Sequence, residues 1–229
     1  MISCSEMKKI FELGRVIEND SLNAYLHTAY KLKLNNYRLI SDGELSVRGA
    51  GLDVPDFMKE FLRFHGEALM IANVINDKII SITLRSMGPK KEFSKIGISK
   101  NMLYGLGQMS KDFKFGQPIL LVEGHLDRDV ISELYSNSLA LTTNMINKSQ
   151  AEILKRLTNK FILMLDNDEA GRKGTQNAYN ILKGCKIKSI HHENGMKDCG
   201  DLVKLELSNI NEYEWVKQMY KSKIEMELY

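Results

Sequence analysis

The feature that most constrains the fold is a regular alternation of short apolar runs with longer amphipathic segments, beginning at Pro118. The runs expected to form strands are 118–124, 139–144, 161–165 and 186–192. The segments between them have helical spacing and are 125–136, 147–159 and 169–184, with Ser149 near the expected start of the second. Strands that alternate with helices, and are buried on both faces, are typical of a parallel α/β sheet. We therefore expect a mostly parallel four-stranded sheet with flanking helices.

The chain before this alternation predicts a smaller α+β subdomain. Residues 5–34 have helical spacing, and residues 41–56 contain the glycines and the proline typical of a loop. Residues 58–70 predict a short helix that turns at Gly66, and residues 68–85 predict a hairpin. We expect three regions: this subdomain over 1–115, the α/β domain over 116–205, and a C-terminal helix over 206–229.

Composition narrows the class of protein. The net charge is +3 and the pI is about 8.6, which allows an anionic partner without requiring one. The three cysteines are scattered and lack zinc-site spacing, which indicates a reducing compartment and no zinc. No apolar run approaches the roughly 20 residues of a membrane-spanning helix, and we expect a cytosolic protein without a membrane partner.

Acidic residues follow two of the predicted strands. Glu123 comes after the first, and Asp166 and Asp168 come after the third. In open α/β sheets, ligands bind at the carboxyl ends of the strands. Carboxylates gathered there raise each other's pKa values unless a cation neutralises them, and a set of oxygen ligands favours Mg²⁺ or Mn²⁺. Such a site suits phosphoryl or nucleotidyl transfer.

Each of these residues also has a purely structural interpretation. A lone Asp-x-Asp is common where a strand ends and a helix begins, and Glu169 is suited to a first helical turn. Asp127 and Arg85 are compatible with ordinary surface positions, and Gly171 and Gly174 with close helix packing. The lysines that follow Arg85 could form a solvated surface. They are Lys90, Lys91, Lys95 and Lys100.

The order of the motifs resembles a known family. "LLVEGHLDRDVI" (120–131) followed by "LMLDNDEAGRKG" (163–174) is similar to the Toprim domain of primases, topoisomerases, small nucleases and recombination proteins. Further features resemble DnaG-type bacterial and phage primases: the form of "DNDEAGRKG", "LYGL" (103–106), "GPKKEF" (88–93) and "MKDCGDLV" (196–203). The resemblance covers about residues 68–203.

The resemblance implies a role for each matching residue. Glu123 would be a catalytic residue, as a metal ligand or as the general base. Asp166 and Asp168 would also be catalytic and would hold the divalent metals, with Asp127 as a further metal ligand and Asp198 as a supporting acid. The residues implied in holding template and nucleotide phosphates are Arg85, Lys90 and Lys91, to which the same basic stretch adds Lys95 and Lys100. Cys199 and Gly200 depart from the family's proline and acid, and Asp201 follows them.

By this resemblance, the chain is expected to be a DNA primase of phage or plasmid replication. It would make short RNA primers on single-stranded DNA from nucleoside triphosphates, with Mg²⁺ or Mn²⁺ as cofactor. A replicative helicase is an expected partner, and so is a separate zinc-binding protein, because no zinc-ribbon cysteines precede the catalytic region. No strand is rich in aromatic residues of the kind that stack on bases. The alternatives are a Toprim nuclease and a non-catalytic module that binds DNA or the replisome.

Overall fold

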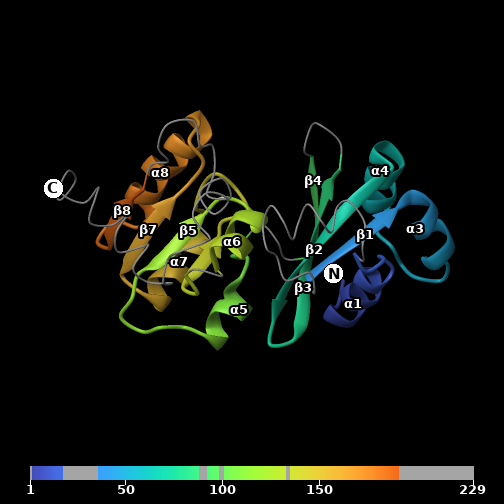
Figure 1. The fold of residues 1–229 in the computed structure, drawn as a ribbon, viewed down its shortest axis with the longest axis horizontal. Coiled ribbons are helices and arrows are strands. Elements are labelled where there is room, and N and C mark those ends of the chain that lie inside the picture. Colours follow the sequence, from blue (N-terminus) through green and yellow to red (C-terminus); the bar gives the residue numbers. More distant parts are fainter. Residues whose placement is uncertain (1, 18–35, 88–91, 98–100, 133–134, 191–229) are drawn as a thin grey trace, which may run out of the picture. The chain divides into compact units, whose positions relative to one another are not determined.

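The computed structural model describes residues 2–17, 36–87, 92–97, 101–132 and 135–190 (Figure 1). These residues divide into two compact units, one ending at residue 97 and the other beginning at Asn101. The C-terminal helix expected over 206–229 lies outside the described residues, and the division into three regions stays a prediction. None of the described helices has the length and apolar composition needed to cross a membrane.

The first unit contains an antiparallel sheet with the strand order β1-β2-β3-β4. Its strands are β1 (Tyr37–Ser41), β2 (Glu67–Ile75), β3 (Lys78–Ser86) and β4 (Phe93–Gly97). The predicted hairpin is confirmed as β2 and β3. Its turn residues, Asn76 and Asp77, have φ values of 50° and 59°, which suit the two-residue turns of right-twisted hairpins. Strands β1 and β4 were not predicted.

Among the described residues of this unit, three helices accompany the sheet: α1 (Cys4–Glu12), α3 (Asp42–Arg48) and α4 (Asp56–His65). Helix α4 confirms the predicted short helix and ends before Gly66, which has a φ of 75°. The prediction of a loop over 41–56 is wrong for residues 42–48, which form α3. There the side chains of Ser41 and Glu44 each accept a hydrogen bond from the other's backbone N–H, which forms a capping box and starts a helix.

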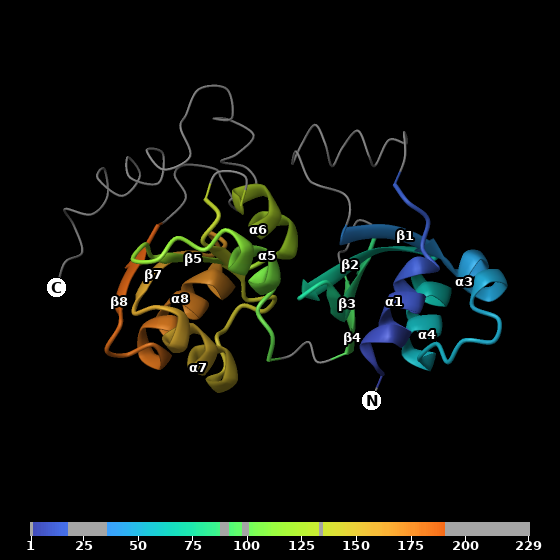
Figure 2. The same cartoon turned by 90° about the horizontal axis from the view of Figure 1, so that it is seen from below.

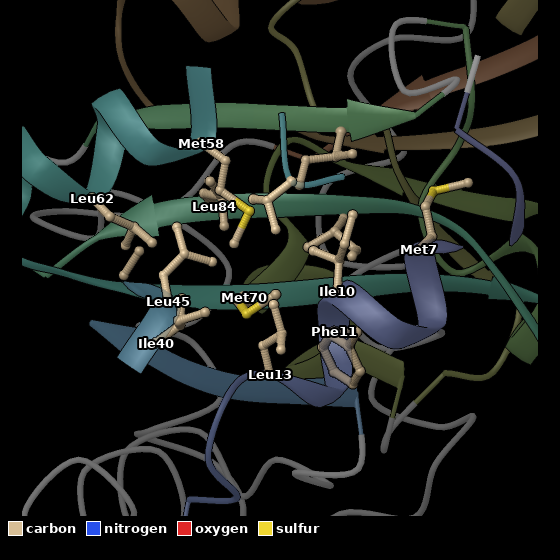
Figure 3. Packing of buried hydrophobic residues seen from close by; sticks show 14 of the residues in the cluster. Met7, Ile10, Phe11, Leu13, Ile40, Leu45, Met58, Leu62, Met70 and Leu84 are labelled. Carbon is tan, nitrogen blue, oxygen red and sulfur yellow. The ribbon is translucent and has the colours of Figure 1, made fainter. Parts of the chain in front are cut away.

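The helices of this unit pack on one face of its sheet (Figure 3). Antiparallel strands alternate their side chains between the two faces, so one half of each strand builds this core. The buried apolar residues on the core side are Met7, Ile10, Phe11, Leu13, Ile40, Leu45, Val54, Met58, Leu62, Ala68, Met70, Ala72, Ile82, Leu84 and Ile96. The register places Tyr37, Ile71, Thr83 and Lys95 in one row on the opposite face.

The second unit contains the parallel sheet that the sequence predicts, with the strand order β6-β5-β7-β8. Its strands are β5 (Ile119–Val122), β6 (Ser138–Ala140), β7 (Lys160–Met164) and β8 (Lys186–Ser189). Its helices are α5 (Leu106–Lys111), α6 (His125–Ser132), α7 (Lys148–Leu157) and α8 (Glu169–Ile181). Figure 2 shows α6 on one side of the sheet and α7 and α8 on the other.

Both faces of the parallel sheet are buried, which explains its nearly continuous apolar strands. All four residues of β5 are buried. The side chains of Leu154 on α7 and Ala178 on α8 join the cluster that contains Ile119 and Leu121. Helix α7 is capped by Asn147, whose side chain accepts a hydrogen bond from the backbone N–H of Gln150 at 3.0 Å, and Ser149 lies in its first turn as expected.

Replacing a central core residue should weaken the first unit. Leu84 is fully buried on the helix-covered face of β3, and Leu84→Ala should lower the free energy of unfolding by about 2–5 kcal/mol because it leaves a cavity. Urea denaturation followed by circular dichroism measures the change. Phe64→Leu is the control, since Phe64 is 81% exposed and its replacement should change stability by less than about 0.5 kcal/mol. Equal losses in the two variants would contradict this core assignment.

Candidate active site

The carboxyl ends of two neighbouring strands bring the predicted acids to one edge of the parallel sheet. Strand β5 pairs with β7 in parallel, and Val122 lies opposite Met164 at the end of both strands. Glu123 follows Val122 directly, and Asp166 follows Met164 by two residues. The structure therefore places Glu123 and the Asp166–Asp168 segment after adjacent strand ends, where ligands of open α/β sheets bind.

Backbone hydrogen bonds fix the start of the turn at Glu123. The carbonyl oxygen of Glu123 accepts from the N–H of Thr142 at 3.0 Å, and that of Val122 accepts from the N–H of Leu141 at 2.9 Å. Thr142 has a φ of 60°, which is uncommon for a β-branched residue and is held by this pairing. The carboxylate atom Oε2 of Glu123 is shielded from solvent. Glu123 is thus anchored from the loop after β6 as well as from β5.

Asp168 also caps the helix that follows the acidic segment. It is the N-cap of α8, and its Oδ1 atom accepts a hydrogen bond from the N–H of Gly171 at 2.9 Å. The carboxylate has a second oxygen, so capping still allows Asp168 to bind a cation. Glu169 forms an ion pair with Lys173 at 2.6 Å on the exposed side of α8, which fits a first-turn helix acid.

Gly171 and Gly174 allow α8 to pack closely on the edge of the sheet. A Cβ atom at Gly171 would collide with the backbone carbonyl of Asp166, and one at Gly174 would collide with the carbonyl of Asn144. These contacts support the structural interpretation of both glycines, which is close helix packing. Through Gly171, the position of α8 sets the position of the Asp166 backbone.

Asp127 lies against the turn after β5. The carboxylate of Asp127 lies over Gly124, so a Cβ atom at residue 124 would require this side chain to shift. Asp127 is partly buried and stands in the first turn of α6. The solvated surface position considered from the sequence does not describe it, because its carboxylate folds back over the segment that follows Glu123.

A hydrogen-bonded network beside this turn was not predicted as part of the site. The Tyr104 hydroxyl donates to Asp129 Oδ2 at 2.6 Å, and Arg128 donates to Asp129 Oδ1 at 2.9 Å and to the Ser138 carbonyl at 3.2 Å. Arg128 is only 4% exposed. Gly105, with a φ of 88°, lies directly against the Arg128 guanidinium. The network ties "LYGL" to α6, and the adjacent Arg-Asp pair of "HLDRDVI" is the sequence signal that could have revealed it.

The predicted cations that the structure describes lie in the first unit. Arg85 is in β3 and Lys95 in β4, both partly buried on the face opposite the helices. Burial lowers the pKa of the Lys95 ammonium, because the charged form loses solvation. The remaining predicted site residues, Lys90, Lys91, Lys100 and Asp198, lie outside the described residues.

The predicted acids do not form a closed cage of protein ligands. Within the described part of the chain, no group of three or more histidine, cysteine, aspartate or glutamate side chains is arranged to hold a metal ion. The pairing of β5 with β7 does bring Glu123 and Asp166 to the same edge. Convergence of Glu123, Asp166 and Asp168 on one ion stays a prediction.

Comparison with known proteins agrees with this geometry. Residues 120–203 match the family model described as Toprim-like. A DNA primase of Clostridium acetobutylicum is 29% identical over 170 residues, which cover 70% of this chain and 28% of the relative. The chain therefore matches little more than a quarter of that protein's length.

Solved structures extend the likeness beyond residues 120–203. One similar structure is a crystal structure of the zinc-binding and RNA polymerase domains of the Aquifex aeolicus primase. The match covers 96% of this chain and 62% of that chain, with a TM-score of 0.73 and 17% identity. A DnaG primase catalytic domain bound to single-stranded DNA covers 96% and 80%, with a TM-score of 0.66 and 17% identity. The predicted fold class and the resemblance to DnaG-type catalytic regions are confirmed.

Breaking the network beside the Toprim-like site should cost substantial stability. Asp129→Ala leaves the buried Arg128 guanidinium without its carboxylate, and we expect the free energy of unfolding to fall by about 3–5 kcal/mol. Asp129→Asn, which keeps an oxygen for Arg128, should cost less. Urea denaturation measures both variants, with Glu152→Ala on exposed α7 surface as the control. If Asp129→Ala were as stable as Glu152→Ala, the network would have no structural importance.

Proposed function

We propose that this chain is the catalytic region of a DNA primase, a nucleotidyltransferase that extends short RNA primers on single-stranded DNA. The observation that carries the proposal is the placement of Glu123 and the Asp166–Asp168 segment after adjacent parallel strands of a Toprim-like domain. The match to a DNA primase over 70% of this chain supports the reaction class. The proposal concerns the activity of the whole protein. The matching relative is much longer than the part of it that this chain covers.

The donor chemistry of this edge fits a divalent cation. Glu123, Asp166 and Asp168 offer only carboxylate oxygens, which Mg²⁺ and Mn²⁺ prefer over the nitrogen and sulfur ligands typical of zinc. Mg²⁺ usually takes one or two protein carboxylates and completes its coordination with water and phosphate oxygens. We propose Glu123 and Asp166 as its main ligands, with Asp127, Asp168 and Asp198 in support. The bound ion would neutralise charge on the reacting phosphate.

The protein's own residues divide the remaining work. Glu123, with one oxygen shielded from solvent, is proposed to act as a ligand or as the general base that accepts the proton of the attacking hydroxyl. Arg85 and Lys95, together with Lys90, Lys91 and Lys100, are proposed to hold template and triphosphate oxygens. Such contacts are largely blind to base sequence. The similar DnaG domain was solved with single-stranded DNA, which supports this partner.

The wider setting follows from the proposed reaction. We propose that the protein acts in phage or plasmid replication. It would then lie in the cytosol of a bacterium or of a phage-infected host. A replicative helicase would deliver the single-stranded template. A zinc-binding module accompanies the RNA polymerase domains in the similar Aquifex aeolicus structure. We propose a zinc-binding protein as a further partner.

Primer synthesis tests the proposal directly. The protein is incubated with single-stranded DNA, the four ribonucleoside triphosphates and Mg²⁺ or Mn²⁺, and labelled products are resolved on a gel. Template-dependent oligoribonucleotides should appear and should vanish when EDTA removes the metal. Asp166→Asn should lower the rate by roughly 10²–10³-fold or more, because it removes a preorganised charge at the reacting centre.

Glu169→Gln is the matched control. Glu169 lies three residues after Asp166, and in the described structure its ion pair is with the solvent-exposed Lys173. Its rate should stay near that of the wild type. DNA cleavage in place of synthesis would identify a Toprim nuclease. Binding without either product would identify a non-catalytic module. Full synthesis by Asp166→Asn would show that the site is misassigned.

The salt dependence of DNA binding tests the basic residues separately. Lys95→Met should weaken binding to single-stranded oligonucleotides of any sequence and should lower the slope of log K against log salt by about 0.7, the value for one phosphate contact. Lys78→Met, at the exposed β2–β3 hairpin, should leave the slope unchanged. Fluorescence anisotropy titrations at several salt concentrations measure both slopes. An unchanged slope for Lys95→Met would remove Lys95 from the proposed phosphate contacts.

A further inference from the structure

One face of the antiparallel sheet in the first unit changes character from one edge to the other. This is the face opposite the packed helices. Its β1 and β2 positions are apolar and buried, as at Leu39 and Leu69. The same row continues to Arg85 on β3 and Phe93 on β4. The face therefore begins as a buried apolar surface and ends, at strand β4, with a cation and an aromatic ring.

Phe93 is unusual in its exposure. Its side chain is 53% exposed, and among the described residues it is the one exposed large hydrophobic residue that lies in a strand. Single exposed apolar residues are common and need no explanation by themselves. What distinguishes Phe93 is its surroundings, because the register fixes which side chains share its face.

Two cations share that face with Phe93. Arg85 is directly opposite Phe93 across the β3–β4 pair, where side chains of an antiparallel sheet lie side by side. Lys95 is two residues further along β4 and so points to the same face, opposite Thr83. The Lys95 stem is partly buried, which directs its ammonium group from a fixed position. An exposed aromatic ring is thus flanked by two cationic side chains on the same face of the sheet.

We propose that Phe93 stacks on an unpaired base of a single-stranded nucleic acid, while Arg85 and Lys95 contact its phosphates. Every base has a π-face, so a ring at this position adds affinity without reading sequence, as aromatic residues do in proteins that bind single strands. The cations supply the charge complement that an apolar protein partner would not need. The assignment of this strand as a primer template rests on the proposed function.

The test compares two phenylalanines in the same unit. Phe93→Leu should weaken binding to a fluorescent oligo-dT by roughly 5- to 100-fold, the range for losing one stacked base. Phe93→Tyr, which keeps a ring, should restore affinity to near wild type. Phe64→Leu is the control, because Phe64 is more exposed than Phe93 but stands on α4, a helix of the unit's other face. It should bind as the wild type does.

The salt slope separates stacking from a damaged phosphate site. Because stacking releases no counterions, Phe93→Leu should lower affinity at every salt concentration with an unchanged slope, unlike Lys95→Met. Wild-type affinity in Phe93→Leu, or an equal loss in Phe64→Leu, would overturn the proposal. So would a reduced slope, or failure of Phe93→Tyr to restore binding. Weaker binding of ATP with unchanged binding of oligo-dT would overturn the assignment to a strand and indicate the base of a nucleotide instead.

The outcomes also separate this proposal from the proposed function. If the wild type binds oligo-dT with the expected dependence on Phe93 but makes no primers, the stacking residue stands and the primase activity fails. If the wild type makes primers and Phe93→Leu binds template equally well, the activity stands and the stacking residue fails.

Discussion

The parallel pairing of β5 with β7 is the constraint on which the candidate site depends. Its register aligns the ends of the two strands, so that Glu123 and Asp166 follow at one edge although they are 43 positions apart in the chain. The helices on both faces shield that pairing from water, as parallel sheets require. A slip of one residue would move Asp166 away from Glu123.

The backbone around that edge leaves the acids little freedom. Helix α8 meets the Asp166 backbone through Gly171, and the Asp127 carboxylate lies over Gly124. The loop after β6 holds the Glu123 carbonyl from the other side. Acidic groups kept close to one another are destabilising without a cation. A cation bound at this edge, as proposed for this site, would relieve such repulsion.

The sequence predicted the parts of the structure whose signals are local and repeated. The parallel sheet, the β2–β3 hairpin and α4 follow from apolar periodicity, turn residues and glycine stops. Helix α3 was missed because Gly43, Gly49 and Gly51 outweighed the Ser41–Glu44 capping box in a short segment. Strands β1 and β4 were missed because five residues carry too little periodicity, and their partners are set by tertiary pairing.

The same limit explains what the sequence could not reveal about the site residues. Asp166 was recognisable because the acids are adjacent in the chain, whereas the contact of Tyr104 with Asp129 joins residues that only the fold brings together. Phe93 is a sharper case. No strand is rich in aromatic residues, which argued against a stacking surface when counted along the chain. Pairing across the sheet sets one ring directly opposite Arg85. A surface built from several strands is therefore better recognised from the residues that pair across strands than from the composition of any one strand.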